Sequence, residues 1–190
     1  FHLHVRDCDI LKCVMPHVAR HFKRGMIMPN LSPPVLNIEM ALDYKSRILK
    51  VVPNNVFDPK MTLYLTPSTK PEDIKAAQVE GSVIAIKYYP VGATTNSEYG
   101  VKGIYQCHAV LDEMQKTGMP LSIHGEVVDA DIDIFDREQV FIDTILSKIT
   151  ADFPQLKIIL EHVSTIEGIQ FVENGGSNIA ATITAHHMLL

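Results

Sequence analysis

The sequence predicts an α/β fold in the form of an incomplete TIM (β/α)8 barrel. Short apolar runs rich in β-branched residues alternate with longer stretches of helical pattern, as in βαβ units with a parallel sheet. Runs such as VIAIKYY (83–89) and LKIIL (156–160) are apolar almost throughout, which is typical of strands buried on both faces. We expect about seven strands and six helices, whereas a closed barrel has eight of each. The alternative is an open doubly wound sheet, although no glycine-rich dinucleotide turn follows the first strand.

The expected elements follow one another along a single domain, residues 1–190. The expected strands are His2–Val5, Gly25–Met28, Met61–Leu65, Val83–Tyr88, Leu121–His124, Lys157–Glu161 and Asn178–Ile183. The expected helices are Ile10–His21, Asn37–Val51, Pro71–Glu80, Ile104–Thr117, Asp136–Ile149 and Thr165–Glu173. Acids follow Pro71 in the first turn of its helix, and Gly118 ends the fourth helix. The last β/α unit of a full barrel is missing, so we expect a partial barrel domain.

Composition narrows the possible functions. The chain has 190 residues and a net charge of −5, so it lacks the basic surface that nucleic-acid binding requires. The three cysteines form no regular framework, and no apolar run approaches the roughly 20 residues that span a bilayer. We therefore expect a cytoplasmic protein without a nucleic-acid or membrane partner. The chain begins directly with a strand and ends on the apolar segment ITAHHMLL, so we expect it to be truncated at both ends.

The first strand carries a candidate metal-binding pair. His2 and His4 are two residues apart, so both side chains point to one face of the strand. Two imidazoles on one face can chelate a divalent metal. The alternative is that both are ordinary strand histidines without a ligand.

Three further polar residues follow apolar strands at the end where barrel enzymes keep their active sites. They are Lys87, His124 and His162. Taken singly, each could be a snorkelling lysine or a hydrogen-bonded core histidine. Taken with the first pair, they converge on one axis. The acids near strand ends are Glu126 and Glu161, and neither offers an obvious position for bridging two metals.

Seven motifs in the same order resemble the dihydroorotase family, of the separate-enzyme type found in bacteria and many eukaryotes, within the amidohydrolase superfamily. The motifs are FHLHVRD, GMIMPNL, IKYYPVGATTNS, IHGEV, DIDIFDRE, LEHVST and AATITAHH. The resemblance runs over the whole chain. It implies a cyclic amide hydrolase that interconverts N-carbamoyl-L-aspartate and (S)-dihydroorotate in pyrimidine (UMP) biosynthesis, with a small-molecule substrate and a homodimer when full length.

The resemblance also implies roles for single residues. His2 and His4 would bind the more buried of two zinc ions, and His124 and His162 the second. Lys87 would react with carbon dioxide, and its carbamate would bridge both metals. Arg6 and Asn30 would hold the substrate carboxylate, with Thr94 and Thr95 on the loop that closes over it. An alternative for Arg6 is an ion pair with one of the acids at the start of the first helix, Asp7 or Asp9.

The chain departs from the family pattern near its end. Ala185 stands where the family has proline, which weakens any role for His187. The family's catalytic aspartate follows the eighth strand, beyond Leu190, so we expect this chain alone to be inactive. The acids of 129–136 are interpreted as a solvated cluster that caps a helix start. Two alternatives remain: an inactive fragment that serves as a metal- or partner-binding scaffold, and a related amidohydrolase for another cyclic amide, such as a hydantoin.

Overall fold

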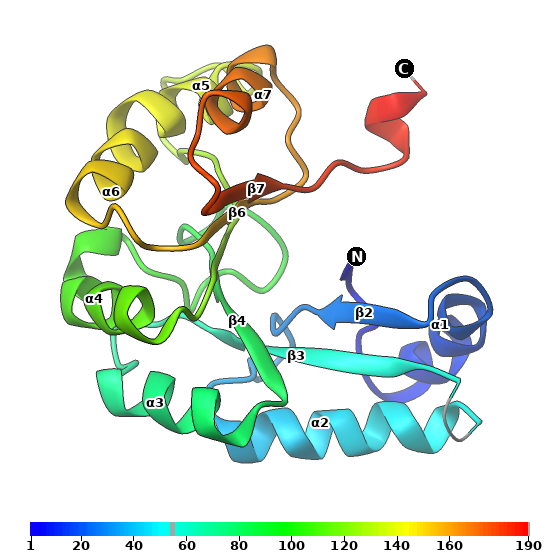
Figure 1. Ribbon diagram of the computed structural model, residues 1–190. Coiled ribbons are helices and arrows are strands. Elements are labelled where there is room, and N and C mark those ends of the chain that lie inside the picture. The colour runs from blue at the N-terminus through cyan, green and yellow to red at the C-terminus, as the bar shows by residue number, and fades with distance from the viewer. Residues whose placement is uncertain (54–55, 190) are drawn as a thin grey trace.

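A computed structural model describes residues 1–53 and 56–189 of the chain. Its core is one sheet of seven parallel strands, ordered in space as they are along the chain (Figure 1). The strands are β1 (His2–Leu3), β2 (Arg24–Ile27), β3 (Asp58–Tyr64), β4 (Val83–Tyr88), β5 (Leu121–Ile123), β6 (Ile158–Leu160) and β7 (Ile179–Ala181). This order and direction are those of a (β/α)8 barrel that lacks its last unit, so the predicted incomplete barrel is confirmed.

Helices on the convex side cover the curved sheet, and its open side lies between the two ends of the chain (Figure 1). The α-helices are α1 (Cys8–His21), α2 (Ile38–Val51), α3 (Pro71–Glu80), α4 (His108–Thr117), α5 (Arg137–Phe141), α6 (Ser147–Asp152) and α7 (Ile166–Glu173). One short 3₁₀ turn, Ile104–Cys107, directly precedes α4, and another, His186–Met188, lies near the end of the described residues. A π-helical turn, Ile142–Leu146, joins α5 to α6.

The predicted elements all exist, and the differences lie at their ends. β1 stops at Leu3 rather than Val5, because only two of its residues pair with β2. β3 begins at Asp58, three residues before the predicted start, because the ladder with β2 extends back to Arg24. The helix predicted from Asp136 is interrupted by the π-helical turn, where the Ser147 hydroxyl donates to the Ile142 carbonyl five residues earlier at 2.7 Å.

Burial is deepest in the middle of the sheet and weakest at its two edges. All three residues of β5 are buried, as are the last four residues of β3 and of β4. By contrast, β1 is only half-buried, and two of the three residues of β7 are exposed. Among the described residues, no helix combines the length and the apolar character needed to cross a membrane.

Candidate active site at the carboxyl ends of the strands

β1 delivers its two histidines to the inside of the curved sheet. Strand pairing with β2 sets both backbones, and the two-residue period turns His2 and His4 to the same face. Their Nε2 atoms lie 2.9 Å apart, and their ring centroids 4.9 Å. Two neutral imidazoles at this distance can share one hydrogen, and they can equally share one cation.

β5 and β6 deliver two more histidines beside the first pair. His124 follows β5 and His162 lies just beyond β6, with ring centroids 4.7 Å apart. His162 also lies 5.5 Å from the ring of His2. Its backbone has a φ of 43°, a left-handed value that few non-glycine residues adopt, and its N–H donates to Thr182 Oγ1 at 2.8 Å. His124 Nε2 contacts Glu126 Oε1 at 2.5 Å.

Lys87 is the next-to-last residue of β4 and is completely buried. Within the described residues its Nζ has no hydrogen-bond partner, and it lies 5.1 Å from the centroid of the Tyr89 ring. Burial lowers the pKa of this amine to about 8, although the negative charge of Glu161 opposes that shift. A buried lysine without a partner is costly for a structure that does not use it.

Glu161 is the group that sequence reasoning set aside. Its carboxylate is completely buried and accepts hydrogen bonds from Ser122 Oγ at 2.6 Å and Thr182 Oγ1 at 2.5 Å. Its Oε2 also lies 3.0 Å from Nδ1 of His2, whose pKa is lowered by burial. Burial raises the pKa of Glu161, but His2, Lys87 and Ser122 together bring it down to about 2. The sequence signal that could have indicated its role is the acid next to a histidine, Glu161-His162, directly after an apolar strand.

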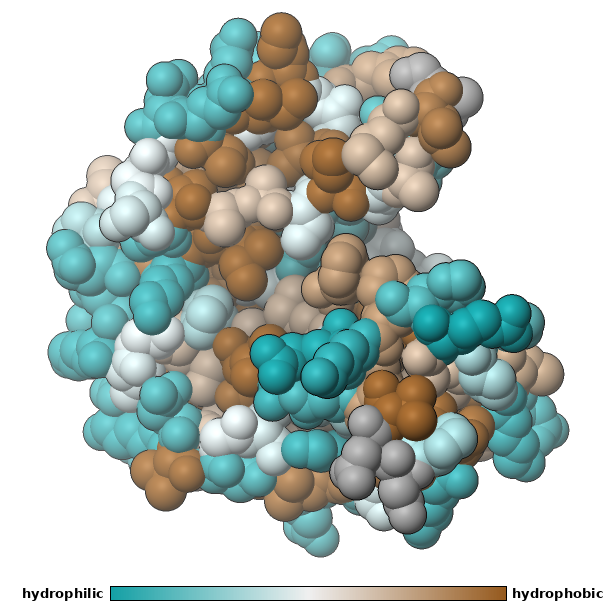
Figure 2. Space-filling view, turned by 45° about the vertical axis from the view of Figure 1, so that its right-hand side comes forward, coloured by the Kyte–Doolittle hydropathy of each residue, from teal (hydrophilic) through white to brown (hydrophobic). Residues whose placement is uncertain are grey.

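The four histidines His2, His4, His124 and His162 line one large cavity. Its volume is about 1260 Å³, and both ends of the chain contribute to its wall. In the space-filling view the surface is deeply notched (Figure 2). His187 lies at the rim in an exposed 3₁₀ turn. The acids of 129–136 are exposed, as the sequence predicted, but the expected capping is absent: Asp136 at the start of α5 makes no side-chain cap hydrogen bond.

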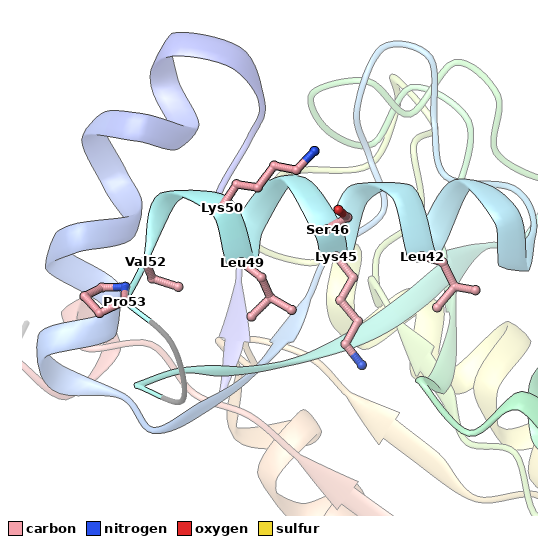
Figure 3. A pocket seen from close by; sticks show the side chains of 7 residues that line it. All are labelled: Leu42, Lys45, Ser46, Leu49, Lys50, Val52 and Pro53. Carbon is pink, nitrogen blue, oxygen red and sulfur yellow. The ribbon is translucent and has the colours of Figure 1, made fainter.

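A second hollow, of about 610 Å³, lies on the outer side of the molecule along α2. Figure 3 shows that two lysines and apolar side chains line it, mostly from α2 itself. Lys45 Nζ donates to Ser82 Oγ at 3.1 Å, so one of these two lysines already has a partner. This hollow contains no histidine or carboxylate, which makes the histidine-lined cavity the candidate site.

The four residues that the resemblance assigns to the substrate lie at the same end of the sheet. Thr94 lines the cavity, whereas Arg6 is absent from its wall. Asn30 is buried, and its Nδ2 donates to the Thr95 carbonyl at 2.9 Å, so its amide holds the 90–100 loop in this state. The alternative prediction, an ion pair of Arg6 with Asp7 or Asp9, is wrong, because both acids pair with other residues.

The acids at the start of α1 have other partners. Asp7 accepts from Arg47 Nη2 at 2.9 Å and from Arg47 Nε at 3.1 Å, and Asp9 pairs with Lys12 at 2.9 Å. Within residues 1–53 and 56–189, Arg6 makes no ion pair. Its φ of 58° ends the extended run after β1, and its carbonyl accepts from the Tyr44 hydroxyl at 2.5 Å. The guanidinium is thus left available for an anion.

The donor set fits zinc, which is bound by imidazole nitrogens and carboxylate-type oxygens. The facing Nε2 atoms of His2 and His4 and the partnerless Nζ of Lys87 are the observations that support this fit. In the part of the chain that the structure describes, no three histidine, cysteine or carboxylate side chains already form a metal-binding group. His124 is turned onto Glu126, so it would have to turn away to bind a metal.

Comparisons with known proteins give relatives that are named dihydroorotase. No protein-family model matches the chain. It is 53% identical to a curated protein named dihydroorotase from Aromatoleum aromaticum, over 100% of the chain and 56% of that protein. A solved dihydroorotase from Campylobacter jejuni superposes with a TM-score of 0.91 at 38% identity, over 100% of the chain and 54% of that structure.

A solved dihydroorotase from Saccharomyces cerevisiae, in complex with 5-fluoroorotic acid, gives a TM-score of 0.90 at 32% identity. The match covers 100% of the chain and 56% of that structure. The chain therefore spans about half the length of the curated relatives it matches. Over that half, the chain is similar in sequence and in fold to proteins named dihydroorotase.

Proposed function

We propose that the natural full-length protein is a zinc-dependent dihydroorotase and that this chain supplies most of its metal site. The reaction would interconvert N-carbamoyl-L-aspartate and (S)-dihydroorotate in pyrimidine (UMP) biosynthesis. The observation that carries the proposal is the clustering of four histidine rings. The buried amine of Lys87 lies close enough for its charge to add to burial in lowering the pKa of His2, His4 and His162, and among the described residues it has no hydrogen-bond partner. The resemblance also supports a cytoplasmic homodimer, which is part of the proposal.

His2 and His4 would hold one zinc ion, and His124 and His162 the other. Lys87, as a carbamate, would bridge the two with its two oxygens. Zinc held by these residues would supply a water of lowered pKa and would polarise the ring amide carbonyl. Glu161, against the Nδ1 side of His2, would leave the Nε2 lone pair of His2 to the metal.

Carbamate formation requires the free amine of Lys87. Its nitrogen lone pair forms a bond to the carbon of carbon dioxide, and the nitrogen loses one proton to water, leaving an anionic carbamate. Because burial lowers the pKa of this amine to about 8, more of it is neutral near pH 7 than of a solvent-exposed lysine. The absence of a competing hydrogen bond among the described residues favours the same reaction.

Substrate recognition would rest on an anion site at the same end of the sheet as the cavity. Arg6 offers a planar fork without an ion-pair partner among the described residues, and it would take the substrate carboxylate. Asn30 would bind the same carboxylate, and its Nδ2 would then donate to the substrate instead of to the Thr95 carbonyl. That exchange would couple binding to a movement of the loop that holds Thr94 and Thr95. The solved yeast relative, in complex with an orotic acid derivative, supports a carboxylate ligand.

The test is an assay of dihydroorotate hydrolysis together with zinc content, on the purified natural full-length protein. We expect turnover and two zinc ions per chain. His162→Asn should lose one zinc and most activity, while His17→Asn, an exposed histidine on α1, should change neither. Zinc binding without turnover of dihydroorotate or a hydantoin would favour the scaffold alternative, and turnover of a hydantoin alone would replace the proposed substrate.

A further inference from the structure

We infer that Glu138 is a positioning residue that sets the distance between the two histidines proposed for the second metal. It does so by clasping the loop beyond β6, which carries His162, to the segment beyond β5, which follows His124. This inference rests on the proposed function, because it concerns how that metal site is held.

Glu138 makes an unusual set of contacts for one carboxylate. It lies in α5 and is buried, with 8% of its surface exposed. Its Oε1 accepts from Thr165 Oγ1 at 2.6 Å, from Thr165 N at 2.9 Å and from Ser164 N at 3.1 Å. Its Oε2 accepts from Ser164 N at 3.2 Å and from Ser164 Oγ at 3.4 Å. One side chain thus satisfies four donors that are 26 and 27 residues away.

The same carboxylate stabilises the beginning of α7. Thr165 is the N-cap residue of that helix, and its hydroxyl oxygen also accepts from Gly168 N at 3.1 Å. A negative charge at a helix N-terminus is favourable. A Cβ atom at Gly168 would lie 2.6 Å from Glu138 Oε1, so the absence of a side chain there is what lets the carboxylate approach.

The clasp acts on His162 because that residue is held from two sides. On the strand side, His162 N donates to Thr182 Oγ1 at 2.8 Å, and Val163 N donates to the Thr182 carbonyl at 2.9 Å. On the helix side, Glu138 binds the two residues that follow Val163. Between these anchors, His162 keeps its left-handed φ of 43°, which needs support from its surroundings.

The other end of the clasp belongs to the segment after His124. The Val127 N–H donates to the Arg137 carbonyl at 3.3 Å, which ties this segment back to the start of α5, next to Glu138. The clasp therefore joins the two loops whose histidine rings lie 4.7 Å apart. Among the described residues, the partners of the Glu138 carboxylate are Ser164 and Thr165, and neither His2 nor His4 is one of them, so loss of the clasp should affect one metal and spare the other.

The experiment is a zinc titration of the metal-stripped natural full-length protein against a chromophoric chelator, with dihydroorotate turnover measured at each zinc concentration. In Glu138→Ala we expect one of the two zinc ions to bind about 10-fold less tightly and the other to keep its affinity, which is the low end of the loss seen when a direct partner of a metal ligand is removed. Saturating zinc should restore most of kcat, which general misfolding would not allow. Thr165→Val, which removes only one donor, should show a smaller change in the same direction.

Glu173→Ala is the matched control, since Glu173 is an exposed acid in the last turn of α7. It should leave both affinities unchanged. Equal weakening of both metals, or unchanged affinities in Glu138→Ala and Thr165→Val alike, would overturn the inference. If the wild-type protein bound no zinc, the proposed function would fail and the inference with it. A failure of the inference alone would leave wild-type zinc content and turnover intact.

Discussion

The two halves of the histidine cluster are built in different ways. His2 lies in β1 and His4 directly follows it, so both owe their direction to a short strand whose backbone pairs with β2 on one side. His124 and His162 lie beyond their strands, in loops where carboxylates such as Glu126 contact the ring or its neighbouring backbone. One half is thus positioned mainly by backbone register, with Glu161 beside His2, and the other mainly by side chains.

This difference predicts different sensitivities. Register is a collective property, so a single side-chain change in the β1 half should alter chemistry without moving the histidines. In the β5–β6 half, each lost hydrogen bond can leave a buried donor or acceptor unpaired, at a cost of about 1–3 kcal/mol. Mutations there should change geometry and stability together.

Lys87→Ala is expected to have the largest effect, because Lys87 lies between the two halves. Without the amine, no carbamate can form, and the two zinc ions would lack their shared oxygens. Because metal assistance is worth several kcal/mol, turnover should fall on the order of 10³-fold or more. Zinc content of the natural full-length protein, measured beside turnover, checks this.

Lys70→Ala provides the control, since Lys70 is exposed before α3. It should keep full activity and metal content. A Lys87→Ala protein that retained both zinc ions and its activity would rule out a carbamate bridge. Lys87 would then not connect the two halves of the histidine cluster.

Much of this site could be predicted from local sequence, and the reason is geometric. A histidine two residues from another on a strand, or just after an apolar strand, has its direction set by the strand itself. That reasoning predicted the placement of five residues: His2, His4, Lys87, His124 and His162. The same reasoning predicted the strand order of the barrel, since parallel strands with intervening helices allow few other topologies.

The supporting carboxylates could not be predicted in this way. Glu161 meets Ser122 across 39 residues, and Glu138 meets Thr165 across 27. Such contacts depend on how loops fold back, which no period of two or 3.6 encodes. For the same reason the sequence left open whether Arg6 pairs with Asp7, while the structure assigns Asp7 to Arg47 on α2.

Arg6→Met should have the next largest effect and should sharpen the comparison on the β1 side. A charge-assisted contact to a carboxylate contributes about 1.5–3 kcal/mol. The Michaelis constant for dihydroorotate should therefore rise roughly tenfold or more, with zinc content unchanged. Arg24→Met is the control, because the side chain of Arg24 is exposed and pairs with Asp58. An unchanged Michaelis constant in Arg6→Met would remove Arg6 from the proposed carboxylate site.

Gly168→Ala should have the smallest effect and should test the β6 side by stability alone. A new Cβ would lie 2.6 Å from Glu138 Oε1 and 2.6 Å from Val163 Cγ1. The carboxylate cannot give way easily, because Ser164 and Thr165 hold it through hydrogen bonds. Alanine is the better helix former by up to about 1 kcal/mol, whereas overpacking costs about 1–3 kcal/mol. The cost of the clash should exceed the gain in helix propensity, so the free energy of unfolding should fall by roughly 1 kcal/mol.

Urea unfolding of Gly168→Ala and of Gly103→Ala would measure this difference. Gly103 is exposed, has a negative φ, and would present its new Cβ to open space, so that variant should unfold at the wild-type midpoint. In Gly168→Ala the midpoint should fall without a change in the slope, because the packing changes and the surface exposed on unfolding does not. Zinc at saturating concentration should recover part of the loss, since a ligand that binds only the folded state stabilises it. An unchanged midpoint would mean that Glu138 and Val163 relax freely, and that the β5–β6 half is no more dependent on side-chain contacts than the β1 half.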